Sequence, residues 1–83
     1  MDLSRFEIIG PISDVQIIAV NRQIRELHNL RKLFGNARWR KMKGFAAVRF
    51  SNGLVFRSEL HWYEAHGIGR RKMKVKQLLE QLS

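Results

Sequence analysis

The chain has 83 residues, no cysteine and a formal net charge of +9 at pH 7. Its length indicates one domain with a modest core, and its hydrophobic content of 45% is that of a folded protein rather than a disordered one. The absence of cysteine excludes a disulfide framework, a cysteine-based zinc site and a thiol nucleophile.

The positive charge is concentrated in the second part of the chain. Residues 1–37 carry five Lys/Arg against four Asp/Glu, whereas residues 38–83 carry eleven against three. A basic region of this size predicts a polyanionic partner, with nucleic acid favoured over an anionic membrane. No apolar run approaches the roughly 20 residues of a membrane span, and residues 1–5 do not resemble the start of a signal peptide. The sequence therefore predicts a cytoplasmic protein without a membrane partner.

The first elements in chain order are two β-branched runs and a helix. Residues 6–9 and 15–20 are typical of strands, either two separate strands or one strand broken at Pro11, which has no N–H to donate to a sheet. After Asn21, which can cap a helix, apolar residues recur at helical spacing as far as Gly35. This pattern predicts an amphipathic helix over residues 22–34.

The remainder of the chain favours strands joined by turns. Residues 38–44 show no clear pattern, and residues 45–50 and 54–66 flank Asn52-Gly53, a strong hairpin signal. Residues 67–69 end the second strand, and residues 72–76 alternate cationic and apolar side chains, with a helical turn or more strand after them. The predicted fold class is α+β, a single domain over residues 1–83. Its expected order is β-α-β-β-β, with the helix packed on a mainly antiparallel sheet.

Side-chain alternation divides the predicted strands into an apolar face and a polar face. In residues 54–66, Leu60 and Trp62 belong to the apolar face, and Glu59, His61 and Tyr63 to the polar one. A β-bulge would change which residues share a face. If the strands are neighbours, the polar face also collects the cations Arg49, Arg57, Lys72, Lys74 and Lys76.

The polar face and the following turn contain the groups that RNA cleavage without a metal requires. A carboxylate or a neutral imidazole can take the proton of the 2′-hydroxyl, and a histidine can protonate the leaving oxygen. Cations can stabilise the phosphorane, and a tyrosine can contact a base or a phosphate. Alternation puts the two histidines of this stretch on opposite faces unless the strand ends between them. The candidate catalytic residues are His61, His66, Glu59, Glu64, Tyr63 and Arg57.

A second set of residues is suited to holding nucleic acid without chemistry. Four cations surround Trp39, and cations beside a stacking ring suit single-stranded nucleic acid; the same ring could instead cover the edge of the core. No cofactor is predicted, and no metal site, because the histidine spacing is not that of a helical metal motif. The candidate nucleic-acid-binding residues are Arg38, Trp39, Arg40, Lys41, Lys43, Arg49, Arg70, Arg71, Lys72, Lys74 and Lys76.

Two stretches, Trp39–Gly44 and the block His61-Trp62-Tyr63-Glu64-Ala65-His66-Gly67, carry a resemblance. With their surroundings over most of residues 15–80, they resemble an uncharacterised family of short, basic bacterial proteins, largely cyanobacterial. The resemblance supports the boundaries of the elements and implies no mechanism. At the level of fold the chain is also similar to RelE/ParE-type toxins, although those open with two helices and this chain with a strand. No catalytic residue is transferred from them.

Three functions are compatible with these observations. The first is an RNA-directed protein, a metal-independent endoribonuclease of toxin type. The second is a non-catalytic nucleic-acid-binding module, in which RNA is expected rather than DNA. The third is a protein-interaction subunit such as an antitoxin, whose basic face meets an acidic partner; a cognate antitoxin or another protein is a possible partner for the first reading too.

Overall fold

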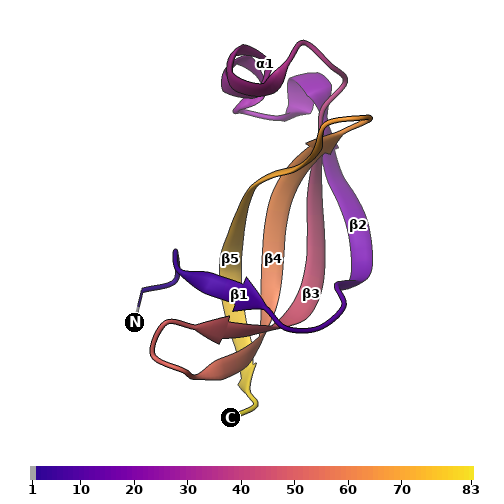
Figure 1. The fold of residues 1–83 in the computed structure, drawn as a ribbon. Coiled ribbons are helices and arrows are strands. Elements are labelled where there is room, and N and C mark those ends of the chain that lie inside the picture. Colours follow the sequence, from indigo (N-terminus) through magenta and orange to yellow (C-terminus); the bar gives the residue numbers. More distant parts are fainter. Residues whose placement is uncertain (1) are drawn as a thin grey trace.

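A computed structural model of the chain, which describes residues 2–83, is dominated by one curled antiparallel sheet (Figure 1). Strands hold 56% of the described residues and helical segments 13%. The helical segments lie together at one end of the sheet, and both chain termini lie towards the other end. The elements are β1 (Phe6–Ile8), β2 (Ser13–Val20), the 3-10 turn η1 (Asn21–Gln23), α1 (Leu27–Phe34), β3 (Arg40–Phe50), β4 (Val55–Ala65) and β5 (Gly69–Gln81).

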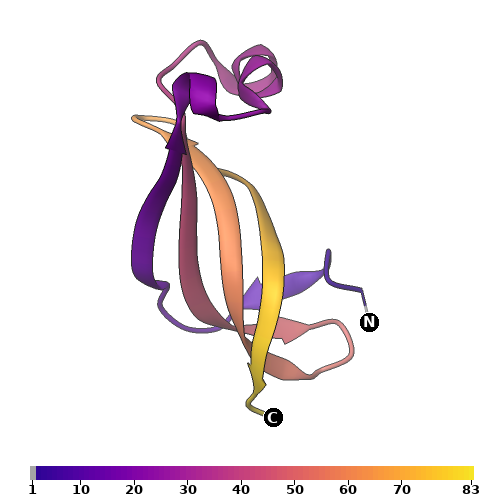
Figure 2. The same cartoon turned by 180° about the vertical axis from the view of Figure 1, so that it is seen from behind.

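The sheet is built around β3 and β4, which pair along almost their whole length. β3 pairs with β4 on one side, and on its other side it pairs with β2 near Arg40–Phe45 and with β1 near Val48–Phe50. β1 and β2 therefore follow one another along a single edge of β3, as one strand interrupted at residues 9–12. β5 forms the opposite edge of the sheet (Figure 2).

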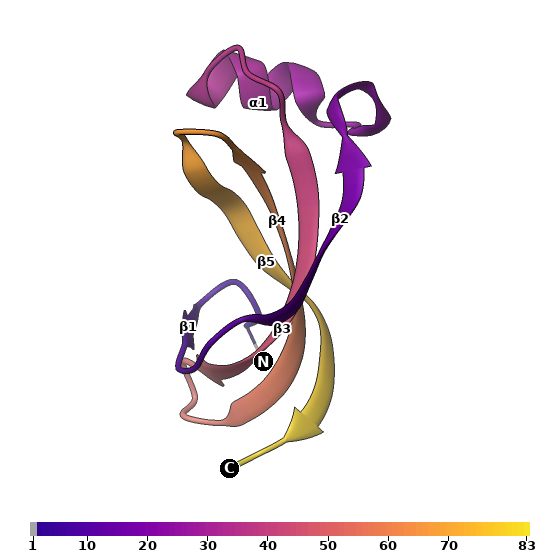
Figure 3. The ribbon, with the colours of Figure 1, turned by 90° about the vertical axis from the view of Figure 1, so that its right-hand side faces the viewer.

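The prediction of an α+β fold with a helix packed on one face of the sheet is wrong. The predicted helix over residues 22–34 is interrupted, because Ile24 is extended (φ −90°, ψ 121°) and α1 begins only at Leu27. Asn21 does not cap α1: it has φ 47°, and its Oδ1 accepts a hydrogen bond from the Trp39 N–H at 2.9 Å. The eight residues of α1 cross the end of the sheet instead of covering a face (Figure 3).

Sheet replaces helix and loop in two further places. Arg40–Gly44, for which no pattern was found, is the first half of β3, and the segment after Val75 continues as strand to Gln81 rather than turning into a helix. Beyond Gln81 the chain still follows β4, since the Leu82 N–H donates to the Val55 carbonyl at 2.7 Å. Within residues 2–83, neither helical segment has the length and apolar character needed to cross a bilayer.

Two apolar clusters hold the sheet and its helical end. The first lies on the face that we call the inner face, which carries Leu60 and Trp62, and it extends from Met42 to Val75 with β1 packed against it. The second joins Trp39 and the helical segments to the opposite side of β4 at its C-terminal end. β4 therefore contributes core residues to both sides, and the predicted division into one apolar and one polar face applies only to part of it.

Candidate nucleic-acid interface

The face opposite the inner one, here called the outer face, carries the odd-numbered residues of β4. Two rows of side chains cross it. One row runs from Lys41 on β3 through Tyr63 to Arg71 on β5, and the next from Lys43 through His61 to Lys74. Directly paired residues on one face have Cβ atoms roughly 5 Å apart. Tyr63 and His61 of β4 therefore each lie between two cations, one from β3 and one from β5.

His61 lies in the middle of the outer face but is largely covered, with 8% of its surface exposed. Its Nε2 is 2.7 Å from Oε2 of Glu59, and the side chain of Glu59 is 17% exposed. A carboxylate only accepts, so Nε2 carries the proton in this hydrogen bond. Nδ1 is buried and has no hydrogen-bond partner among the described residues. The two predicted catalytic groups Glu59 and His61 are thus brought together.

His66 and Glu64, by contrast, lie away from this pair. His66 is exposed in the turn after β4, five residues beyond His61; at about 3.3 Å per residue the two are roughly 16 Å apart. Glu64 belongs to the inner side, where it accepts hydrogen bonds from Trp62 Nε1 at 2.8 Å and from Arg40 at 3.3 Å. A site that uses both histidines is not formed.

Tyr63 is a core residue as well as a member of the outer face. Only 6% of it is exposed, and it packs in the second cluster with Trp39 and Ile24. Burial, and then the Glu26 carboxylate, raise the pKa of the Tyr63 hydroxyl above its ordinary value of 10.0, while Lys72 acts in the opposite direction. The hydroxyl therefore keeps its proton at neutral pH and can donate a hydrogen bond.

A pocket of about 350 Å³ lies between the outer face and the segment that joins η1 to α1. The sheet contributes Lys41, Tyr63 and Lys74, together with residues of β2, and Lys41 Nζ is 5.9 Å from the centre of the Tyr63 ring. Glu26, on the helical side, is held by Lys72 of β5 at 2.9 Å, so an ion pair ties the helical segment to the sheet. The remaining lining residues are Ile18, Ala19, Gln23, Ile24 and Arg25.

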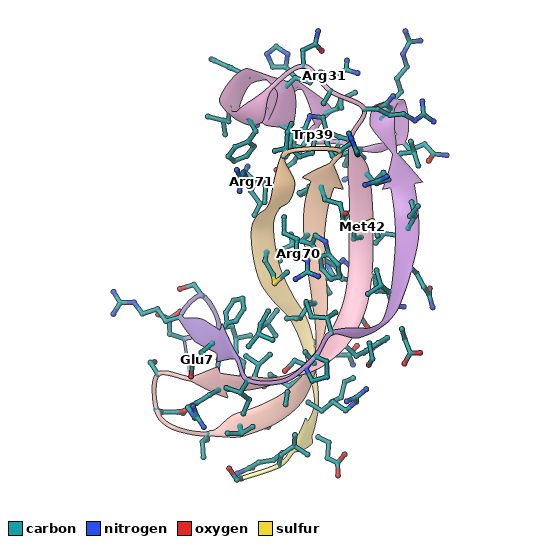
Figure 4. The ribbon with its side chains drawn as sticks, turned by 45° about the vertical axis from the view of Figure 1, so that its right-hand side comes forward. Glu7, Arg31, Trp39, Met42, Arg70 and Arg71 are labelled. Carbon is teal, nitrogen blue, oxygen red and sulfur yellow. The ribbon has the colours of Figure 1, made fainter. Side chains whose placement is uncertain are left out.

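Trp39, expected on a basic surface, is fully buried and lies beside the helical segments (Figure 4). Its Nε1 donates to the Gly35 carbonyl at 3.1 Å, and its ring packs against Phe34. Its indole is therefore part of the core and cannot stack on a base in this structure. The neighbouring Arg38 stays exposed, and Arg40 is engaged with Glu64.

The other predicted cations are distributed over several surfaces. Arg70 lies on the inner side over the Trp62 ring, and Arg71 lies beside β5 over Phe34 (Figure 4). Arg49 pairs with Glu7, and Arg57 donates to the Ser13 hydroxyl. Register shifts flank Lys74 on both sides, so the three lysines do not form the regular row that alternation predicts. Lys76 falls at one shift. Lys72, with φ 54°, falls at the other, and its ammonium group reaches Glu26 beside the outer-face pocket.

Residues 23–26 were missed as part of the site. Arg25 reads as one of several cations off the apolar stripe of a helix, and nothing in the pattern indicates that the helix breaks at Ile24 and turns this segment towards the sheet. Within residues 2–83, no three His, Asp or Glu side chains gather closely enough to hold a metal ion.

No family model matches the chain, and no significant match was found among curated proteins or among solved structures. The resemblance to a bacterial family and the looser likeness to RelE/ParE-type toxins therefore stay predictions.

Proposed function

We propose that the protein binds single-stranded nucleic acid, RNA in the first place, on the outer face of its sheet. The observation that carries this proposal is the pair of cross-strand rows, in which Lys41, Lys43 and Lys74 flank Tyr63 and His61. Phosphate contacts by such cations supply most of the affinity of a protein for a nucleic-acid strand.

The availability of these lysines supports the proposal. Four ion pairs between an Arg or Lys and a carboxylate occur within residues 2–83, and none of them includes Lys41, Lys43 or Lys74. Their ammonium groups are therefore free to exchange water and counterions for phosphate. Release of the counterions of the nucleic acid favours binding and makes it depend on salt.

The ring beside the lysines favours a single strand over a duplex. Phe45, half-buried on the outer face next to Glu59, has the ammonium group of Lys43 5.7 Å from its ring centre. An aromatic ring among cations on a sheet can stack an unpaired base, which is how several single-strand-binding modules work. The short helix α1, whose Leu30 is buried in the core, lies outside this face and is not part of the proposed binding surface.

Salt-dependent binding of a labelled RNA oligonucleotide, measured by fluorescence anisotropy, tests the proposal. We expect the logarithm of affinity to fall linearly with the logarithm of salt concentration, and Lys43→Gln or Lys74→Gln to lower that slope by about 0.7 each. Lys32→Gln is the matched control, because it removes the same charge from an exposed position on α1. Equal slopes for all three variants would locate binding elsewhere, and no RNA binding by the wild type would refute the proposal.

A second candidate function, metal-independent RNA cleavage, is favoured by one contact. The hydrogen bond of 2.7 Å between Glu59 and His61 orients an imidazole in the lysine rows, and such a pair can act in general acid–base catalysis. The reaction is tested with labelled RNA in EDTA. Cleavage should be lost in His61→Ala and retained in His28→Ala, whose histidine is exposed on α1. If the RNA stays intact after prolonged incubation with the wild type, cleavage is refuted and binding is the remaining proposed function.

A further inference from the structure

We infer that the pocket beneath residues 23–26 binds a terminal nucleotide carrying a phosphate monoester, so that the protein recognises the phosphorylated end of a single strand. This inference rests on the proposed binding of nucleic acid by the outer face. It assigns to the pocket a ligand that the rows of lysines alone do not define.

The position of the pocket is the first argument. A strand that follows β4 from Glu59 past His61 reaches Tyr63 and there meets the segment Gln23–Glu26, which forms the far wall of the pocket. The helical segments cross this end of the sheet (Figure 3). The path along the outer face is therefore closed at one end, and a closed path suits the end of a chain better than its middle.

The charge of the pocket is the second argument. Three cations line it, Arg25, Lys41 and Lys74, and its single carboxylate, Glu26, is paired with Lys72. The three lining cations thus lack a carboxylate partner within residues 2–83, and the lining as a whole has a surplus of two positive charges. A phosphate monoester carries about −1.5 to −2 at pH 7, whereas a phosphodiester within a chain carries −1. The surplus therefore favours a terminal phosphate over an internal one.

The third argument concerns hydrogen bonding by Tyr63. Its hydroxyl is protonated at neutral pH, as that of an ordinary tyrosine is, and burial and Glu26 raise its pKa further. It can therefore donate to a phosphate oxygen. Hydrogen bonds to an ionised acceptor are stronger than those between neutral groups. Lys41, above the same ring, would contact the same phosphate.

The size and the apolar part of the lining are the fourth argument. The volume of about 350 Å³ lies within the roughly 300–1,000 Å³ of small-molecule pockets. Ile18, Ala19 and Ile24 form an apolar wall, and Gln23 contributes an amide that can both donate and accept hydrogen bonds. Cations with an apolar wall fit a phosphate attached to a flat, partly apolar base rather than inorganic phosphate alone.

The test compares one RNA sequence with three kinds of end: a 5′-phosphate, a 3′-phosphate, and hydroxyl groups at both ends. We expect one phosphorylated form to bind the full-length protein at least about tenfold more tightly than the hydroxyl form, as one or two charge-assisted hydrogen bonds provide. Lys41→Gln and Tyr63→Phe should reduce this ratio towards one. Lys43→Gln, whose lysine lies on the outer face but outside the pocket, should weaken all three RNAs and keep the ratio. Circular dichroism checks that each variant is folded.

Each contrary result has a distinct meaning. If the three RNAs bind equally, or if the ratio persists in both pocket variants, the end-recognition inference is overturned and the proposed function stands. If no RNA binds, both fail. A free nucleoside 5′- or 3′-monophosphate is the last arm. If it binds as tightly as the RNA with that end, the pocket takes free nucleotides, which also overturns recognition of an RNA end.

Discussion

Gly44 offers a sharp test of how the β1–β2 connection, β3 and β4 pack together, because a single added methyl group would collide with half-buried Ile12 and buried Trp62. Gly44 is buried on the inner side of β3, opposite Leu60. A Cβ at this position would lie 2.6 Å from Cγ2 of Ile12 and 3.0 Å from the end of the Trp62 ring. Carbon atoms pack favourably at about 3.5–4.0 Å. Gly44→Ala therefore forces a displacement of roughly 1 Å in a packed region.

The expected cost follows from opposing contributions. Overpacking in a core costs about 1–3 kcal/mol. Trp62 is 1% exposed and has no space to move into, and Ile12 can move Cγ2 only by leaving its preferred χ1 rotamer or by shifting its backbone. The lower backbone entropy of alanine in the unfolded chain offsets about 0.4–1 kcal/mol. Gly44→Ala should still lower the free energy of unfolding by about 1–2 kcal/mol, and in a domain of this size each 1 kcal/mol lowers Tm by about 4–8 °C.

Urea and thermal unfolding, followed by circular dichroism, measure this loss. Gly10→Ala is the matched control, because its added Cβ would meet nothing within 4 Å, and its stability should equal or slightly exceed that of the wild type. In the double variant with Ile12→Ala, the combined loss should be smaller than the sum of the two single losses, since the clashing methyl is gone. A Gly44→Ala protein as stable as the Gly10→Ala control would refute the packing described for this strand.

Two more predictions concern Tyr63 and Asn21. The chain has one tyrosine, so tyrosinate absorbance reports the titration of Tyr63 alone, and its midpoint in the folded protein should lie above pH 10.0. The free energy of unfolding should fall as the pH rises from 10.0 through the folded pKa, because the unfolded state loses this proton first. The Tyr63→Phe variant should lack this loss. A midpoint at or below 10.0 would contradict its burial beside Glu26. Asn21→Gly should cost about 1 kcal/mol for the lost bond to the Trp39 N–H, and Asn21→Ala about 1–2 kcal/mol more because φ is 47°; equal urea-unfolding energies for the two variants would contradict this.

Local signals of the sequence predicted the turns and the inner side of the sheet. Asn52-Gly53 forms the β3–β4 turn, with the Gly53 N–H donating to the Phe50 carbonyl at 2.9 Å, because this dipeptide tolerates the required backbone angles. Leu60 and Trp62 are buried in the inner cluster, as alternation predicts. These features depend on neighbours in sequence or on a period of two residues, and both are visible in a single chain.

The helix and the fold class could not be predicted in this way, because tertiary contacts override the helical pattern. Ile24, which fits the apolar stripe of a helix, is instead buried against Trp39 and Tyr63. The Asn21 side chain, a helix-capping group by type, binds the backbone of Trp39, eighteen residues later. Each of these contacts joins segments distant in sequence, so their effect on residues 21–26 appears only once β3 and β4 are in place.

The candidate site was predicted only in part, because some of its features depend on local spacing and others on how the strands pair. The pairing of Glu59 with His61 follows from their spacing of two residues on one strand. The register shifts in β5, which break the regular alternation of Lys72, Lys74 and Lys76, were revealed by no pattern.

The outer face obtains its cations from β3 and β5, while β4 supplies the uncharged and acidic groups between them. Only His61 lies between two lysines, Lys43 and Lys74. Glu59 lies between Phe45 and Gln77, and Tyr63 is covered because it packs in the second cluster. A phosphate held by Lys43 and Lys74 would therefore lie beside the imidazole of His61, since the three residues form one cross-strand row. The same lysines would thus serve both proposed functions, binding and cleavage, and the His61→Ala variant separates the two.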